Sequence, residues 1–246
     1  MISAAEAAPR CDEASIDAVR HAHYDGLADD YAAFLDEQSP YYRVAADALR
    51  RLLGPGAGRC LDMGCGGGHF TALAVELGWE LTGVELSRDQ LRHARARLPG
   101  VELVRADAAA LPFADGSFDA AFSTFTHTDF DDFAAAAGEV RRVLRPGGRF
   151  VYIGNHPCFV GATQEHGRGG CPIMHPGYRR AGRWDAVDAP GATPGGWRAR
   201  MGSFVHVPLA HFLEAFAGLA LVACEEPVDG SEYPKTIAVA WEKPRA

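Results

Sequence analysis

Residues 61–70, LDMGCGGGHF, decide the fold class of this chain. An apolar strand expected over residues 59–63 runs into a turn that holds four glycines within residues 64–68, and a helix is expected from His69 to Leu77. Such a turn lets a nucleotide-like ligand approach bare backbone at the carboxyl end of a parallel sheet. Glycine is needed there because a side chain would collide with the ligand.

Short apolar strands alternate with amphipathic helices on both sides of this turn. The pattern favours a mainly parallel, doubly wound α/β sheet with helices on both faces, closed by an antiparallel strand pair near the end of the chain. Strands are expected over residues 59–63, 80–85, 101–106, 120–124, 149–154, 219–224 and 236–241, and helices over 21–35, 40–53, 69–77, 87–98, 130–144 and 208–217.

We predict one domain over residues 1–246. A tail (1–20) precedes two helices (21–56) that act as a lid, and the core follows (57–154). Residues 155–205 lose all periodicity and are rich in Gly, Pro, Arg and His, so we expect an insertion that caps the substrate. Residues 206–246 supply the last helix and strands.

Composition excludes several classes of protein. The chain has 246 residues, 48% of them hydrophobic, and its 24 basic and 32 acidic residues give a net charge of −8. No Lys/Arg run suits a nucleic-acid backbone, so nucleic acid is not expected as the partner. No signal peptide, CxxC pair or membrane-spanning run of apolar residues occurs, so we expect a cytoplasmic monomer or homodimer that acts on a small molecule.

Three acidic residues lie at or next to the ends of three successive predicted strands. Asp62 lies just before the glycine turn, Glu85 ends the second strand and Asp107 follows the third. An acid beside the turn would repel a pyrophosphate, and His69 stands where a dinucleotide fingerprint needs its third glycine. The set therefore favours a cationic adenosine ligand, with Glu85 accepting from ribose hydroxyls and Asp107 from an adenine amino group.

The segments LDMGCGGGHF, GVEL, RADAAALPFADGSFDAAFS and EVRRVLRPGGRF resemble the successive motifs of class I S-adenosylmethionine-dependent methyltransferases. The nearest group is the type 11 or ubiquinone/menaquinone-biosynthesis-like set, and the resemblance covers residues 58–154. It implies a Rossmann-like seven-stranded fold and S-adenosylmethionine as the cofactor, with S-adenosylhomocysteine as the product.

The resemblance also assigns the residues that bind the cofactor. Asp62, Gly64 and Gly66 would hold the methionine end, Glu85 the ribose and Leu86 a face of the adenine, while Asp107 and the Ala108 backbone would contact the adenine edge. Tyr24 and Tyr31 resemble lid aromatics that close over the cofactor, although two core-facing helix residues would give the same pattern. Cys65 of the turn and Thr124 at the end of the fourth strand complete the predicted set.

Methyl transfer needs alignment, exclusion of water and, for some acceptors, a base. His127 and His156 follow the fourth and fifth strands at the edge that faces the ligand, so we predict them as candidate bases; structural histidines are the alternative. His156, Cys158, His166, Cys171 and His175 are zinc-binding types, but their spacing matches no zinc pattern and no metal is predicted.

The sequence leaves the methylated atom open between oxygen, nitrogen and carbon. It also leaves two alternatives to a methyltransferase: a protein that binds the same cofactor but catalyses another reaction such as a cyclisation, and a noncatalytic binding protein. A nicotinamide dehydrogenase is disfavoured by Asp62 and His69.

Overall fold

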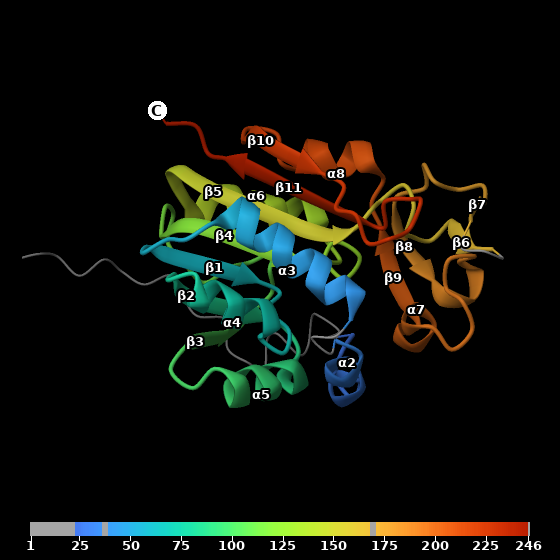
Figure 1. Cartoon of the computed structure of the whole chain (residues 1–246), viewed down its shortest axis with the longest axis horizontal. Coiled ribbons are helices and arrows are strands. Elements are labelled where there is room, and N and C mark those ends of the chain that lie inside the picture. Colours follow the sequence, from blue (N-terminus) through green and yellow to red (C-terminus); the bar gives the residue numbers. More distant parts are fainter. Residues whose placement is uncertain (1–22, 36–38, 168–170, 246) are drawn as a thin grey trace, which may run out of the picture.

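The computed structural model of the chain describes residues 23–35, 39–167 and 171–245 (Figure 1). Within these residues, seven strands form a central sheet in the order β10-β11-β5-β4-β1-β2-β3. The strands from β3 to β5 pair in parallel, and β11 pairs antiparallel with both β5 and β10. The predicted α/β, doubly wound fold with an antiparallel closing pair is confirmed.

The helices and strands have the following bounds in chain order: α2 Ala28–Phe34, α3 Pro40–Leu53, β1 Arg59–Met63, α4 His69–Glu76, β2 Glu80–Glu85, α5 Arg88–Arg97, β3 Glu102–Arg105, β4 Phe118–Thr124, α6 Phe133–Val143, β5 Leu144–Asn155, β6 Gln164–His166, β7 Pro172–Met174, β8 Gly182–Asp185, η2 Ala186–Asp188, α7 Trp197–Met201, β9 Ser203–His206, α8 Leu209–Ala215, β10 Ala220–Glu225 and β11 Thr236–Glu242.

The strands send alternate side chains to opposite sides of the sheet, and helices pack against both faces. Ala121, Phe150 and Tyr152 pack in one apolar cluster with α6 and α8, whereas their neighbours Phe122 and Val151 pack in another with α3 and α4. The central strands are therefore apolar along most of their length, as expected for a parallel sheet covered by helices.

Most predicted boundaries agree with the structure to within a few residues. Ser87 caps α5 as predicted, since its Oγ accepts a hydrogen bond from the Gln90 N–H at 3.2 Å. The first predicted helix is shorter, because residues 23–27 form turns and α2 begins at Ala28; residues 21 and 22 lie outside the described part. The fifth strand is longer and begins at Leu144, which pairs with Phe118 of β4.

The insertion has more regular structure than the sequence indicates. Its described part forms two small hairpins, β6-β7 and β8-β9, and the five-residue helix α7. Trp184, Ala189 and Phe204 are buried in a separate small core with Ala162. Elements of three to five residues are too short for sequence periodicity to reveal them.

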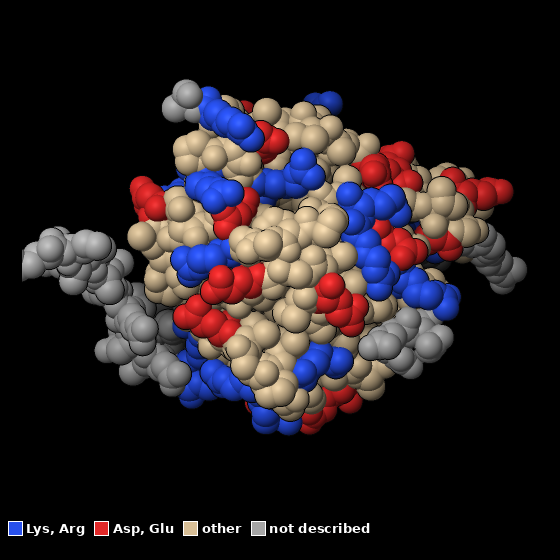
Figure 2. All heavy atoms as spheres, turned by 60° about the vertical axis from the view of Figure 1, so that its left-hand side comes forward, with Lys and Arg blue, Asp and Glu red and all other residues tan. Residues whose placement is uncertain are grey.

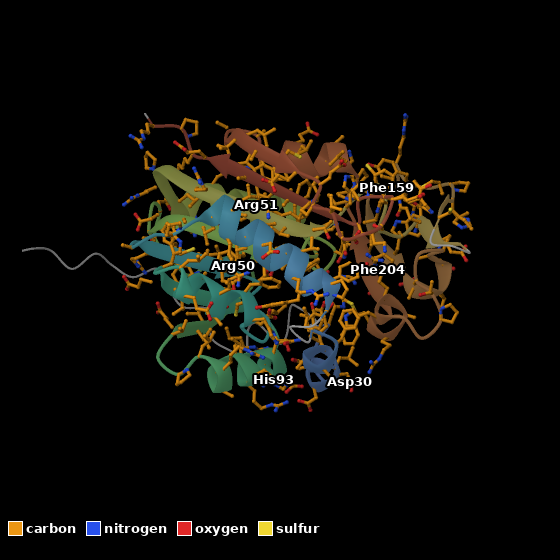
Figure 3. All side chains as sticks on the ribbon, viewed as in Figure 1. Asp30, Arg50, Arg51, His93, Phe159 and Phe204 are labelled. Carbon is orange, nitrogen blue, oxygen red and sulfur yellow. The ribbon has the colours of Figure 1, made fainter. Side chains whose placement is uncertain are left out.

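Ion pairs attach α2 to two other parts of the molecule. Asp29 contacts Arg92 at 3.0 Å and His93 at 2.8 Å on α5, and Asp30 pairs with Arg200 of α7. Figure 3 shows Asp30 and His93 at the edge where α2 meets α5. α2 therefore lies between the core of the sheet and the insertion.

The molecular surface carries mixed charge. On the face in Figure 2, Lys and Arg side chains lie among Asp and Glu side chains without forming a continuous basic stripe. Among the described residues, no helix combines the length and the apolar character that crossing a bilayer requires.

Candidate functional site

The glycine turn after β1 has a backbone that few other residues tolerate. The φ angles of Gly64 and Gly66 are +78° and +51°, and a Cβ on Gly64 would lie 2.6 Å from the Thr126 methyl group. The N–H groups of Gly64 and Cys65 both donate to the carbonyl of Val84 on β2, at 2.8 and 2.9 Å. The turn is thus fixed against the neighbouring strand.

A cavity, here called the loop cavity, lies over this turn at the carboxyl ends of β1 to β4. It encloses about 810 Å³, including space open to solvent. Nine residues predicted from the sequence line it: Tyr24, Tyr31, Gly64, Gly66, Glu85, Leu86, Asp107, Ala108 and Thr124. The cavity lies where the order of the strands reverses between β1 and β4, the usual ligand site of an open α/β sheet.

Backbone hydrogen bonds fix the acids that line the loop cavity. The Glu85 carboxylate accepts from the Gly66 N–H at 3.0 Å and the Ser87 N–H at 2.8 Å, and Asp107 accepts from the Ala109 N–H at 2.9 Å. Burial raises the pKa of Glu85 above its usual value. A carboxylate accepts about four hydrogen bonds, so Glu85 can accept from a ligand donor as well as from the backbone.

Asp62 lies beneath the turn and does not line the loop cavity. It is fully buried; Oδ2 accepts from the Thr71 hydroxyl at 2.6 Å, and Oδ1 has no hydrogen-bond partner in the described chain. Burial raises the pKa of Asp62 to about 7, and the nearby Glu85 carboxylate acts in the same direction. A buried acceptor without a donor is costly, so this atom suits a ligand that brings a cation or a donor to the turn.

A second cavity, here called the insertion cavity, lies beside the first. It encloses about 1110 Å³, including space open to solvent, and most of its wall comes from α2 and from residues 155–204. Four residues line both cavities: Tyr24, Tyr31, Phe125 and Asp129. The two spaces therefore meet at one shared wall, the arrangement that two reacting molecules need.

Backbone strain occurs at this shared wall. Phe125, directly after β4, has φ +59° and is the one non-glycine residue with positive φ in the described part of the chain. A bulky residue in this region costs about 1–2 kcal/mol. Its N–H donates to the Ile153 carbonyl at 2.8 Å, which helps hold the ring between the two cavities.

Asp129 is the acid of the shared wall. Its carboxylate accepts from the Tyr24 hydroxyl at 3.0 Å and from the Thr128 hydroxyl at 3.2 Å. Burial raises the pKa of Asp129 to about 7, so the group changes its protonation state near neutral pH. The rule that selected the histidines, a position just past a strand end, also applies to Asp129, which the sequence analysis missed.

The structure places the two predicted bases away from both cavities. His127 is 2% exposed and its Nδ1 lies 2.5 Å from the Tyr152 hydroxyl, while burial lowers the pKa of His127 to about 3. His156 is 3% exposed; its Nδ1 accepts from the Cys158 N–H and its Nε2 lies 2.9 Å from Glu226. The backbone at both positions lies at the edge of the sheet where the cavities are, but both imidazole rings point into the protein interior.

Cys65 of the turn is another residue predicted to contact the cofactor. It is buried and absent from the cavity wall, and its Sγ lies 3.0 Å from the position that a Cβ on Gly83 would take. The side chain therefore packs against β2 and supports the turn from below. Among the residues that the structure describes, no group of three or more His, Cys, Asp or Glu side chains is arranged to hold a metal ion.

Comparison with known proteins agrees with this geometry. Residues 61–152 match a family described as a methyltransferase domain. The chain is 32% identical to a demethylmenaquinone methyltransferase of Renibacterium salmoninarum over 152 residues, covering 56% of this chain and 64% of that protein. It is 40% identical to a malonyl-[acyl-carrier protein] O-methyltransferase of Methylococcus capsulatus over 107 residues, covering 42% and 39%.

The whole fold has a solved counterpart. An S-adenosylmethionine-dependent methyltransferase from Mesorhizobium loti aligns with a TM-score of 0.66 and 25% identity, covering 84% of this chain and 99% of that one. The chain is thus similar, in its matched domain and in its fold, to S-adenosylmethionine-dependent methyltransferases. It spans less than two thirds of the length of the two curated relatives named above.

The raised pKa of Asp62 makes stability depend on pH. Because the folded state holds this proton more tightly than the unfolded state, the charged carboxyl destabilises the fold increasingly as pH rises from about 4 to about 7. The free energy of unfolding of Asp62→Asn, relative to that of the wild type, should therefore increase by up to about 1.4 kcal/mol per pH unit between about pH 4 and about pH 7. Above about pH 7 this difference should stay constant.

Urea unfolding from pH 4.5 to 8 measures this difference. Comparison between variants is required because the lowered pKa of His127 gives the wild type an opposite trend below about pH 6.5. Glu76→Gln, which removes an exposed acid of α4, is the control and should show a constant difference. A constant difference for Asp62→Asn would contradict the assignment.

Proposed function

We propose that this chain transfers a methyl group from S-adenosylmethionine to a small organic acceptor. The observation that carries the proposal is the pair of adjoining cavities: one lies over a glycine turn and acids at successive strand ends, and the other lies under the insertion. The loop cavity would hold the cofactor and the insertion cavity the acceptor.

The side chains of the loop cavity fit a cationic cofactor. Its wall contains four carboxylates (Glu85, Asp107, Asp129 and Asp131) and, among described residues, neither Lys nor Arg. A pyrophosphate would meet only negative charge there, whereas an ammonium and a sulfonium would be stabilised. The free oxygen of Asp62 beneath the turn supports the same choice.

The proposed contacts follow from the positions of the acids. Gly64 and Gly66 would lie against the methionine end of the cofactor. Glu85 would accept from the ribose hydroxyls with the lone-pair capacity that its backbone donors leave free. Leu86 would pack on the adenine and Asp107 would accept from its amino group, since both line the loop cavity.

When bound, S-adenosylmethionine supplies a methyl group on a positively charged sulfur, and the transfer leaves S-adenosylhomocysteine. The chain itself aligns the reactants and excludes water: Tyr24 and Tyr31 pack edge to face at 4.9 Å between the cavities. Asp129 lies at the same wall and would take the proton that a hydroxyl, amine or acidic carbon must lose.

The insertion cavity, about 1110 Å³ including space open to solvent, has the dimensions of a small-molecule site, which favours a small acceptor over a macromolecule. Location in the cytoplasm and a monomeric or homodimeric state remain predictions from the sequence. The two alternatives, a different reaction with the same cofactor and a noncatalytic binding protein, have no observation in their favour. Mass spectrometry separates them, because only methyl transfer makes S-adenosylhomocysteine and a product heavier by one methyl group.

Calorimetric titration tests the cofactor assignment. Glu85→Gln should weaken binding of S-adenosylmethionine and S-adenosylhomocysteine about 10-fold or more, because the hydrogen bonds from the ribose lose a charged acceptor. Glu76→Gln should leave both affinities unchanged, and thermal unfolding shows whether each variant is folded. Equal affinity for Glu85→Gln and wild type, or binding of NAD in place of S-adenosylmethionine, would refute the assignment.

A second experiment tests Asp129. With an acceptor that must lose a proton, kcat/KM of the wild type should rise with pH and level off above about 7 as Asp129 ionises. Asp129→Asn should lower the plateau about 100-fold or more and remove this inflection. Asp131→Asn, which changes an acid that lines only the loop cavity, should retain the inflection. An unchanged inflection in Asp129→Asn would exclude it as the base.

A further inference from the structure

The insertion cavity carries one cation, the guanidinium of Arg198 on α7. Asp129 is the only carboxylate among the residues that form its wall. The two side chains do not form an ion pair, since no carboxylate of the described residues lies within 4.0 Å of the Arg198 guanidinium. Both oxygens of Asp129 already accept from Tyr24 and Thr128.

The surroundings of Arg198 are aromatic. Its guanidinium lies over the ring of Phe204, 5.2 Å from the ring centroid. Phe204, on β9 of the insertion and labelled in Figure 3, lines the same cavity. Burial lowers the pKa of Arg198, so the charged form is held at a cost in this position. The charge of Asp129 acts on this guanidinium without forming an ion pair with it, so Arg198 can still bind an anionic group of a ligand directly.

A second polar group of the cavity also has no partner. Gln164, at the start of β6, is 3% exposed and lines the insertion cavity, yet neither its amide nitrogen nor its amide oxygen makes a hydrogen bond in the described chain. Buried amides are nearly always hydrogen-bonded. Gln164 can therefore donate to, and accept from, a molecule in this cavity.

Aromatic rings form part of the remaining wall. Trp197 stacks at 13° on Phe34, with the ring centroids 6.0 Å apart, and lies 5.0 Å from Tyr31. All three rings line the insertion cavity. Aromatic walls of this kind bury a planar, conjugated body, and a few polar groups then fix its orientation.

From these contacts we infer that the acceptor is a planar aromatic or conjugated molecule that carries a carboxylate, with Arg198 binding that carboxylate. The inference rests on the proposed function, because it names the class of molecule that enters the insertion cavity. A carboxylate matches the guanidinium fork in two parallel hydrogen bonds, whereas a neutral phenol or amide offers a single acceptor and no charge.

Matched probe pairs test the inference. The protein is saturated with S-adenosylhomocysteine and titrated with 4-hydroxybenzoate, 4-hydroxycinnamate and 1-hydroxy-2-naphthoate, each beside its carboxamide. At least one carboxylate should bind the wild type about 10-fold more tightly than its amide. Arg198→Met should remove this preference, and Arg198→Lys should keep part of it because the charge remains. Arg179→Met, at an exposed arginine of the same insertion, should leave the preference intact.

Four results would overturn the inference. One is that no carboxylate is preferred to its amide, and another is that the preference persists in Arg198→Met. The third is that Arg198→Met, folded by thermal unfolding, loses affinity for S-adenosylmethionine as much as for the carboxylate, which would assign Arg198 to the cofactor instead. Methyl transfer to uncharged acceptors alone would also overturn it while leaving the proposed function intact. Failure to bind S-adenosylmethionine would refute the proposed function itself.

Discussion

The site depends on the bare backbone turn that follows β1. Gly64 cannot carry a side chain because the Thr126 methyl group occupies that space, and the N–H groups of the turn are tied to the Val84 carbonyl and the Glu85 carboxylate. These hydrogen bonds hold the ends of β1 and β2 together beneath the loop cavity. Because the order of the strands reverses between β1 and β4, the residues that follow β4 lie on the other side of the same cavity.

The two cavities differ in the charge of the side chains that line them. The loop cavity is lined by carboxylates and has no Lys or Arg in its described wall. The described wall of the insertion cavity contains one cation, Arg198, and one carboxylate, Asp129. Burial raises the pKa of Asp62 and of Asp129 to about 7, and a bound cation would lower both pKa values. Preorganised groups of this kind align and stabilise reactants without being rearranged during the reaction.

Sequence periodicity predicted the central sheet well because each strand alternates between two buried faces and each helix has one apolar side. Residues at strand ends, such as Glu85 and Asp107, were predicted as site residues because parallel topology brings all carboxyl ends to one edge. Topology does not fix where a side chain points. His127 and His156 turn inward to Tyr152 and Glu226, and Asp129 faces the cavities instead.

The acceptor side could not be predicted to the same degree. Arg198 and Gln164 lie in a segment of short hairpins with no periodic signal, and they meet one cavity only through tertiary packing. Likewise, the strained backbone of Phe125 has no sequence signature, because its positive φ depends on the wall that surrounds it. Residues that we propose to bind the cofactor follow a sequence motif, whereas those that we propose to bind the acceptor depend on the three-dimensional fold of the insertion.

A crystal structure of the chain with S-adenosylhomocysteine tests the central claim most directly. The account predicts the ligand in the loop cavity, with its adenine beside Asp107, its ribose hydroxyls on Glu85 and its sulfur turned toward Tyr24 and Asp129. The insertion cavity should then be open at the sulfur. A ligand bound outside the loop cavity, or one whose sulfur faces away from the shared wall, would contradict the account.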